Sequence, residues 1–279
     1  MFTLNCKGKL LSLEHPIIMG ILNATPDSFY EGHLEKGNDG IMKLATQMIT
    51  EGATIIDVGG QSTRPGSDRI DAAQETARVL PVIEAIRETF PDTIVSIDTY
   101  HSKVAEAAVQ AGAHIVNDIS SGTMDGDMIA TVASLKNVPY ICMHMKGRPE
   151  NMQEHAVYED VVKEVLDFFI AKQEACRQAG INDVILDPGF GFAKTAEHNF
   201  TLLKHLSLLK ILEKPILAGL SRKATIYKTL GITAAEALNG TTVLNTIALM
   251  NGANILRVHD VKEAREAVEL MKAYRDADK

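Results

Sequence analysis

Eight short apolar segments, each ending in a cluster of polar residues, recur along the chain and constrain its fold more than any other feature. Each is followed by a stretch with apolar residues at helical spacing, and several of these stretches end in glycine, such as Gly52 and Gly112. The apolar segments lie within residues 16–29, 54–66, 94–100, 114–122, 139–147, 184–192, 215–223 and 254–260. The expected helices are residues 40–52, 72–90, 101–112, 124–137, 157–180, 195–210, 233–252 and 261–277.

This order of segments predicts an α/β fold, a single (β/α)8 TIM barrel. The apolar segments are nearly continuous, as expected of parallel strands with both faces covered. Eight strand–helix units without a linker fit one domain over residues 1–279. The N-terminal residues indicate a short β-hairpin. A doubly wound open sheet is the alternative, but it would need a glycine-rich turn after the first strand, and ILNATP has none.

Composition disfavours several classes of function. A formal net charge of −8 argues against a nucleic-acid binder, which needs a basic face to neutralise phosphates. No apolar run approaches the roughly 20 residues that span a bilayer, so no membrane partner is expected. Cys6, Cys142 and Cys176 lack CxxC spacing, which argues against disulfides and a zinc ribbon and favours a reducing cytoplasm.

The polar ends of the strands predict where the site lies. In a parallel barrel they converge on the C-terminal face, where barrel active sites are found. We therefore expect one cavity to be surrounded by Asn23, Asp57, Asp98, Asn117, Asp118, His144, Asp187, Ser221, Arg222, Lys223, Arg257 and His259.

Three of these residues favour a planar, nitrogen-rich heterocycle as ligand. Asp98, Asn117 and Asp187 end separate strands. A carboxylate accepts two N–H bonds from an amino-imine edge, and an asparagine supplies both a donor and an acceptor. Each residue alone could equally cap a helix or anchor a strand end. In DPGFGF (187–192), glycines flank Phe190 and permit close backbone approach, and Phe192 offers a ring for stacking.

The last two strands supply cations. SRK (221–223) and RVHD (257–260), together with Ser62, Thr63 and Arg64, could hold a diphosphate through charge-assisted bonds. Asn23 is a neutral oxygen ligand of the kind that a Mg²⁺–phosphate complex tolerates. The chain has neither HExxH nor GxSxG, so a zinc site and a serine hydrolase lack support.

Taken together, the motifs GILNATPDSF, DVGGQSTRPG, SIDTYHSKVAEAAVQAGAHIVNDISSG, MHMKGRPENMQ, ILDPGFGFAKT, GLSRK and RVHD closely resemble dihydropteroate synthase, the sulfonamide target of folate biosynthesis. The resemblance runs from about residue 16 to 260. It implies a barrel, expected as a homodimer, that condenses 6-hydroxymethyl-7,8-dihydropterin diphosphate with 4-aminobenzoate and releases diphosphate.

The resemblance also implies roles for individual residues. Asp98, Lys223 and Arg257 would be catalytic. The pterin would contact Asp98, Asn117, Met143, Asp187, Phe192 and Lys223, and the diphosphate Asn23, Ser62, Thr63, Arg64, Arg257 and His259. Aminobenzoate would lie between Phe29, Pro65 and Ser221, and Mg²⁺ near Asn23 and Asp27. The two loops that carry Phe29 and Arg64 are expected to order over bound diphosphate.

Departures from the family pattern are small: Ala24 replaces valine, Gln61 replaces glutamate, and Ala224 follows the SRK lysine. Two other functions remain as alternatives. A barrel methyltransferase that moves a methyl group from methyltetrahydrofolate to a corrinoid protein should lack STRPG and SRK. A catalytically silent paralogue should show a broken diphosphate set, whereas Asn23, Arg64 and Lys223 are present.

Overall fold

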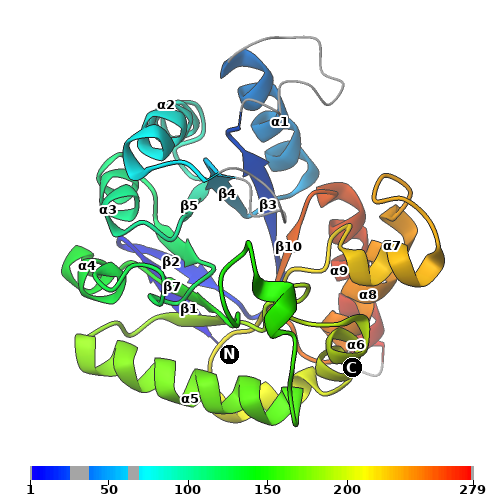
Figure 1. Ribbon diagram of the computed structural model, residues 1–279. Helices are drawn as coiled ribbons and strands as arrows, with labels where there is room; N and C mark the ends of the chain where they lie inside the picture. Colours follow the sequence, from blue (N-terminus) through cyan, green and yellow to red (C-terminus); the bar gives the residue numbers. More distant parts are fainter. Residues whose placement is uncertain (1, 26–37, 62–68, 278–279) are drawn as a thin grey trace.

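The computed structural model describes residues 2–25, 38–61 and 69–277. Within them, eight parallel strands form one sheet in the order β8-β7-β6-β5-β4-β3-β10-β9, and a parallel bridge between Leu186 and Ile216 joins its two edges. The strands form a ring with helices around it (Figure 1), so the predicted barrel is confirmed. The strands are β3 (Ile17–Asn23), β4 (Ile55–Gly59), β5 (Ile94–Asp98), β6 (Ile115–Asp118), β7 (Tyr140–Met143), β8 (Val184–Asp187), β9 (Leu217–Ala218) and β10 (Ile255–Val258).

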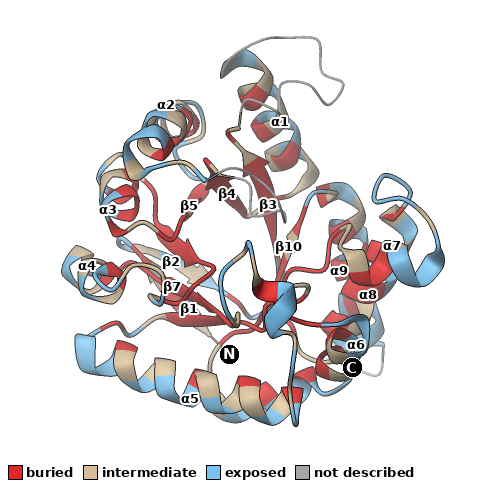
Figure 2. Ribbon diagram, viewed as in Figure 1, coloured by how far each residue is buried: buried red, intermediate tan, exposed pale blue. Residues whose placement is uncertain are grey.

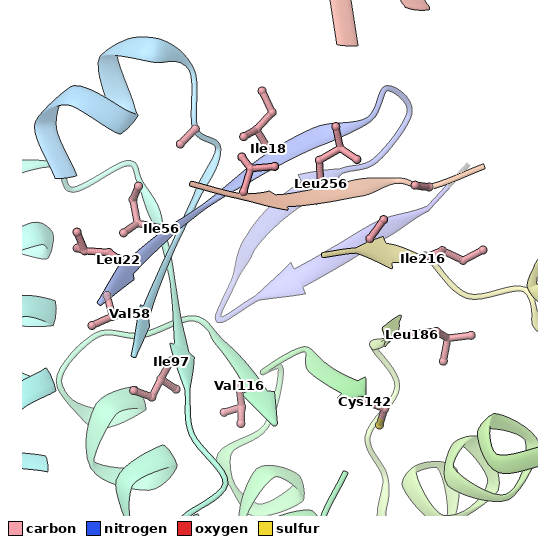
Figure 3. Close-up of a cluster of buried hydrophobic side chains, with 14 of the residues drawn as sticks. Ile18, Leu22, Ile56, Val58, Ile97, Val116, Cys142, Leu186, Ile216 and Leu256 are labelled. Atoms are coloured by element: carbon pink, nitrogen blue, oxygen red, sulfur yellow. The ribbon is translucent and has the colours of Figure 1, made fainter. Parts of the chain in front are cut away.

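Successive side chains of each strand point alternately out of the barrel and into it. The outward set packs under the helices in the main hydrophobic core (Figure 3), which is why the strands are buried on both faces (Figure 2). The inward set begins with one apolar side chain from each strand, and we call these eight the apolar floor: Met19, Ile55, Ile94, Ile115, Ile141, Ile185, Leu217 and Ile255.

The predicted N-terminal hairpin is present and covers the N-terminal end of the barrel. Its strands β1 (Thr3–Cys6) and β2 (Lys9–Ser12) are antiparallel, and Leu4 and Cys6 pack in the same cluster as the apolar floor. The backbone N–H of Asn5 donates to Asp183, just before β8 (2.7 Å). Because the hairpin covers this end, a ligand must reach the barrel interior from the C-terminal ends of the strands.

The helices follow the predicted order with three differences, one of which is the unpredicted 3₁₀ helix η2 (Met152–His155). The single helix expected over 195–210 ends at Lys204 and continues as the 3₁₀ helix η3 (Leu206–Leu212). A helix that the sequence did not predict, α7 (Ala224–Leu230), has seven residues, which is too short for a periodic pattern to stand out. The remaining helices are α1 (Asn38–Glu51), α2 (Ala72–Thr89), α3 (Ser102–Gln110), α4 (Met128–Leu135), η2 (Met152–His155), α5 (Val161–Ala179), α6 (Ala196–Lys204), α8 (Leu238–Met250) and α9 (Val261–Asp276).

Candidate active site

A layer of polar side chains stands directly above the apolar floor, toward the C-terminal end of the barrel. Because side chains alternate along a strand, the residue two positions after a floor residue also points inward. On β5 the inward residue at the strand end is four positions after the floor. Five of the inward positions hold a charged group or an amide instead of hydrocarbon, and we call these five residues the polar layer: Asp57, Asp98, Asn117, Asp187 and Arg257.

Arg257 is the central cation of this layer. Its Nε donates to Asp57 Oδ2 (2.7 Å), and its Nη2 donates to Asp98 Oδ2 (2.5 Å). Asp57 Oδ2 also accepts a bond from Asn117 Nδ2 (2.9 Å). The side chain of Arg257 is 20% exposed and that of Asp98 14%, whereas Asp57 is fully buried. One guanidinium therefore links carboxylates of two strands and still reaches the open end of the barrel.

Asp98 is held in an environment that disfavours its charge. Burial raises its pKa to about 7, Arg257 opposes this rise, and Asp57 adds repulsion. Its strand partners are Gly59 and Asn117. A Cβ on Gly59 would lie 3.7 Å from Asp98 Oδ2 and 3.9 Å from Asn23 Oδ1, so Asn23 and Asp98 flank the same glycine. Protonation of Asp98 is thus poised near neutral pH, and a positive ligand beside it would favour the ionised form.

Asp187 begins the DPGFGF loop and is fixed by it. The backbone N–H of Gly189 donates to Asp187 Oδ1 (2.8 Å), while burial raises the pKa of this carboxyl. Gly189 has a φ of +68°, and a Cβ there would stand 2.0 Å from the carbonyl oxygen of His144, so only glycine fits. The loop is pressed against the end of β7, and Asp187 keeps its place in the polar layer.

Lys223 lies over this loop. Its Nζ donates to the carbonyl of Phe190 (2.5 Å) and stands 4.9 Å from the centre of the Phe192 ring. Burial lowers the pKa of Lys223 to about 8, with Asp187 opposing the shift. Phe192 packs against a cluster that contains Met143. The predicted pterin set thus combines an apolar wall with an ammonium and carboxylates.

At the rim, Ser221 and His259 meet. The hydroxyl of Ser221 lies 3.0 Å from His259 Nδ1, and the backbone N–H of His259 donates to that hydroxyl (3.2 Å). Ser221 is buried and His259 is exposed. The two residues, which the sequence assigned to different ligands, form one hydrogen-bonded pair.

The expectation that every polar residue at the strand ends faces the cavity is wrong for three of them. Asp118 accepts bonds from the Tyr140 hydroxyl, from Ser120 and from the Gly122 N–H. Arg222 pairs with Asp260, and His144 contacts Lys194. Their side chains bind the protein itself and hold the loops that follow the strands.

Lys194 is a buried residue that the sequence reasoning missed. It is 3% exposed, and its Nζ lies within 3.3 Å of His144 Nδ1 and of the carbonyl oxygens of His144, Gly189 and Phe192. Burial lowers its pKa to about 7. An ammonium among three carbonyls ties the DPGFGF loop to the end of β7. Its position two residues after the DPGFGF motif was visible in the sequence, but its burial was not.

Gln61, one of the departures from the family pattern, lies at the edge of an undescribed segment. Its Oε1 accepts a bond from the Tyr100 hydroxyl (3.1 Å). At the other edge, Arg69 forms a bidentate pair with Glu150 and stands 5.7 Å from the Tyr100 ring. Tyr100 therefore contacts both flanks of residues 62–68.

Several predicted site residues and the loops expected to close over substrate lie outside the described residues: Asp27, Phe29, Ser62, Thr63, Arg64 and Pro65. Among the residues that are described, no group of three or more His, Cys, Asp or Glu side chains is placed to hold a metal. No helix in the described part of the chain is long and apolar enough to cross a membrane.

Comparison with known proteins agrees with this geometry. The model of the pterin binding enzyme family matches residues 19–259. Dihydropteroate synthase of Escherichia coli K12 is 44% identical over 269 residues, which cover 96% of this chain and 94% of the relative. The chain belongs to the dihydropteroate synthases, a family of pterin-binding enzymes.

Solved structures of the family share the whole fold. Yersinia pestis dihydropteroate synthase, solved with a sulfonamide drug complex, has a TM-score of 0.92 at 42% identity and covers 98% of this chain and 99% of that one. The Xanthomonas albilineans enzyme in complex with 7,8-dihydropteroate has a TM-score of 0.89 at 34% identity, with 99% of each chain covered. Similarity over full lengths to synthases argues against the methyltransferase alternative.

Proposed function

We propose that this protein condenses 6-hydroxymethyl-7,8-dihydropterin diphosphate with 4-aminobenzoate to give 7,8-dihydropteroate and diphosphate. Its relatives carry the name dihydropteroate synthase, and one of them was solved in complex with 7,8-dihydropteroate. The observation that carries the proposal is the polar layer. Two acids and an amide that suit a pterin edge share one barrel end with Arg257, a cation that suits a diphosphate. The same site binds both the pterin and the diphosphate of the substrate. We also propose that residues 1–279 form one domain.

The pterin lies in the barrel mouth in this proposal. Asp98, Asn117 and Asp187 accept hydrogen bonds from its N–H groups, since carboxylate and amide oxygens accept from an amino-imine edge. Met143 and Phe192 form the apolar wall against which the flat ring packs. Lys223, beside Asp187 and Phe192, donates to an acceptor atom of the ring.

The diphosphate lies toward the rim. Arg257 and His259 bind its oxygens from β10, and Asn23 approaches from β3, with Ser62, Thr63 and Arg64 completing the set. Arg257 is paired with Asp98 in the structure. When diphosphate binds, the Nη groups of Arg257 turn to the anion and Asp98 becomes available to the pterin.

Chemistry then needs no protein nucleophile. The bond between the pterin methylene carbon and the diphosphate oxygen breaks, and its electron pair leaves with the diphosphate, whose charge Arg257 stabilises. Asp98 stabilises the resulting pterin cation electrostatically. The amino nitrogen of aminobenzoate, held between Phe29, Pro65 and Ser221, bonds to the methylene carbon and then loses one proton to water.

Mg²⁺ is proposed as the metal of this reaction, held through the diphosphate by Asn23 and Asp27. The described residue Asn23 fits a hard cation that keeps most of its water, because it offers a neutral oxygen at the C-terminal end of β3, which is the open end of the barrel. When bound, Mg²⁺ would neutralise charge on the leaving group. Loss of activity in chelator and its return on adding Mg²⁺ test this assignment.

A second copy of this chain is the proposed partner. On α8, Val243 and Met250 are 49% and 59% exposed and seven residues apart, so they share one helix face, and Leu230 of neighbouring α7 is 55% exposed. A homodimer would cover this apolar face. Sedimentation of the wild type as a monomer, or no change in the sedimentation of Val243→Glu, would contradict the homodimer.

The free, buried Cys6, Cys142 and Cys176 support a cytoplasmic location.

The direct test supplies pterin diphosphate and labelled aminobenzoate to the purified protein, with and without Mg²⁺. Labelled dihydropteroate in the presence of Mg²⁺ is the expected product. Pterin binding without any product would favour the catalytically silent paralogue instead. Asp187→Asn, which keeps the shape of a pterin-binding residue, is the control for product formed by a contaminant.

A further inference from the structure

Asp57 has no role among the residues assigned to ligands, yet it is the most deeply buried acid of the polar layer. It is fully buried in the middle of β4 and is followed by Val58 and Gly59 of the same strand, so it caps no helix. A buried carboxylate is costly unless it is well paired. Its retention there requires an explanation.

The contacts of Asp57 span the barrel. Its Oδ2 accepts from Asn117 Nδ2 (2.9 Å) and from Arg257 Nε (2.7 Å). Asn117 belongs to β6 and Arg257 to β10, which lie two strands away from β4 on opposite sides. One oxygen atom therefore fixes the position of a proposed pterin-binding amide relative to the proposed diphosphate-binding cation.

Asp57 also decides which way Asn117 faces. A carboxylate only accepts hydrogen bonds, so the amide of Asn117 must turn its NH₂ toward Asp57. Its carbonyl oxygen is then the group presented to a ligand N–H. Asp57 binds Arg257 through Nε alone. The terminal nitrogens of Arg257 can therefore contact Asp98 or an anion.

The second oxygen of Asp57 makes no such contact. Asp57 Oδ1 is buried without a hydrogen-bond partner among the described residues, and so is the hydroxyl of Ser96, its neighbour in strand register. An unsatisfied buried oxygen destabilises a fold. A carboxylate kept at this cost fits a functional demand better than a demand for stability.

We propose that Asp57 is a positioning residue that sets the orientation of Asn117 and Arg257, a role that rests on the proposed function of this site. It does not touch substrate. Through its charge Asp57 also acts on Asp98, whose pKa depends as well on the charges of Asp118, Asp187 and Arg257. Lys223, which follows β9, also interacts electrostatically with Asp98.

The electrostatic consequence has a definite direction. Asp57 repels the charge of Asp98, and the two carboxylates share Arg257. In Asp57→Asn the repulsion between the two carboxylates is absent, and of the two positions only Asp98 still carries a carboxylate that pairs with Arg257. The pKa of Asp98 therefore falls. The acidic limb of kcat/KM, which reports the free enzyme, moves to lower pH. We expect the ratio of kcat/KM at pH 6 to that at pH 8 to rise about threefold or more.

A double-mutant cycle tests the positioning role without any turnover. Asp57→Ala should weaken binding of an unreactive pterin about fivefold or more in the wild type, but less than about twofold in Asn117→Ala, because its effect passes through Asn117. Calorimetry measures all four proteins. Asp118→Asn is the matched control: it removes another buried acid, whose side chain hydrogen-bonds neither Asn117 nor Arg257, so its effect should be the same in both backgrounds.

The outcomes are separable. An additive cycle, or an acidic limb that Asp57→Asn leaves in place, overturns the positioning role. If Asp57→Ala does not fold, Asp57→Asn keeps the shape, and its pH profile decides. If the wild type binds pterin but makes no dihydropteroate, the proposed reaction is wrong, and the binding cycle still decides what Asp57 does.

Discussion

Replacement of Arg257 by alanine should destabilise the protein by an amount that grows with pH. The guanidinium is the partner of Asp57 and Asp98, at 2.7 and 2.5 Å. Removing one partner of a buried ion pair costs about 3–5 kcal/mol, because the remaining charge stays buried without compensation. Asp98 can escape part of this cost by taking up a proton, since its pKa is already raised to about 7.

The sign of the pH dependence follows from Asp98. Arg257 is the largest cause that lowers the pKa of Asp98, so its removal raises that pKa further. A protein that contains an acid whose pKa is raised in the folded state loses stability as the pH rises from the pKa of that acid in the unfolded chain to its pKa in the folded protein. The wild type completes this loss near pH 7, whereas Arg257→Ala continues to lose stability above it. The difference in unfolding free energy should grow above pH 7 by about 1.4 kcal/mol per unit.

Urea unfolding of both proteins at pH 6, 7, 8 and 9 measures this difference. Arg177→Ala is the control, because its partner Glu174 has a pKa lowered to about 2 by bonds from Arg177 and Gln178 and stays ionised throughout. Arg177→Ala should lower the unfolding free energy by a small amount that is equal at every pH. A deficit of Arg257→Ala that is also equal at every pH would refute the coupling of Arg257 to Asp98.

Three further substitutions test other parts of the site. Asp187→Asn should weaken pterin binding by about 1.5–3 kcal/mol through loss of a charge-assisted bond, and unchanged affinity in calorimetry would remove Asp187 from the pterin site. Asp98→Asn should reduce kcat more than it weakens pterin binding, because the charge matters most once the cation forms; equal losses in single-turnover and binding experiments would contradict the mechanism. Lys194→Met should lower stability by about 3–5 kcal/mol, because it leaves buried carbonyl acceptors without a donor, and should raise KM for the pterin substrate. An unchanged melting curve would show that these contacts contribute nothing to stability.

The barrel was predictable because its local signals agree with each other. Strands such as Ile55–Gly59 and Ile115–Asp118 begin with two apolar residues, one for each face, and stand before helix-like segments, and this repeated order admits few folds other than a parallel barrel. The hairpin was predictable in the same way. Helix α7 was not, because seven residues make about two turns and too few positions repeat.

The contacts of the site were harder to predict. Lys194 and Glu75 are both charged residue types that composition places at the surface, yet they are 3% and 1% exposed. What buries Lys194 is a cage of carbonyls from His144, Gly189 and Phe192, which lie on two different loops. Backbone oxygens carry no sequence signal, so no pattern in the chain reveals such a cage.

One distinction, however, was available in the sequence and depends only on the period of two along a strand. Asn117 lies two positions after the floor residue Ile115 and faces inward, whereas Asp118 lies three positions after it and binds Tyr140 outside the barrel. Likewise Met143 follows Ile141 by two and faces inward, while the side chain of His144 does not. Spacing from the floor residue of each strand therefore excludes Asp118 and His144 from the cavity and includes Asp57. The same rule gives Asp57 a place in the polar layer that strand-end position alone could not, because two more residues of β4 follow it.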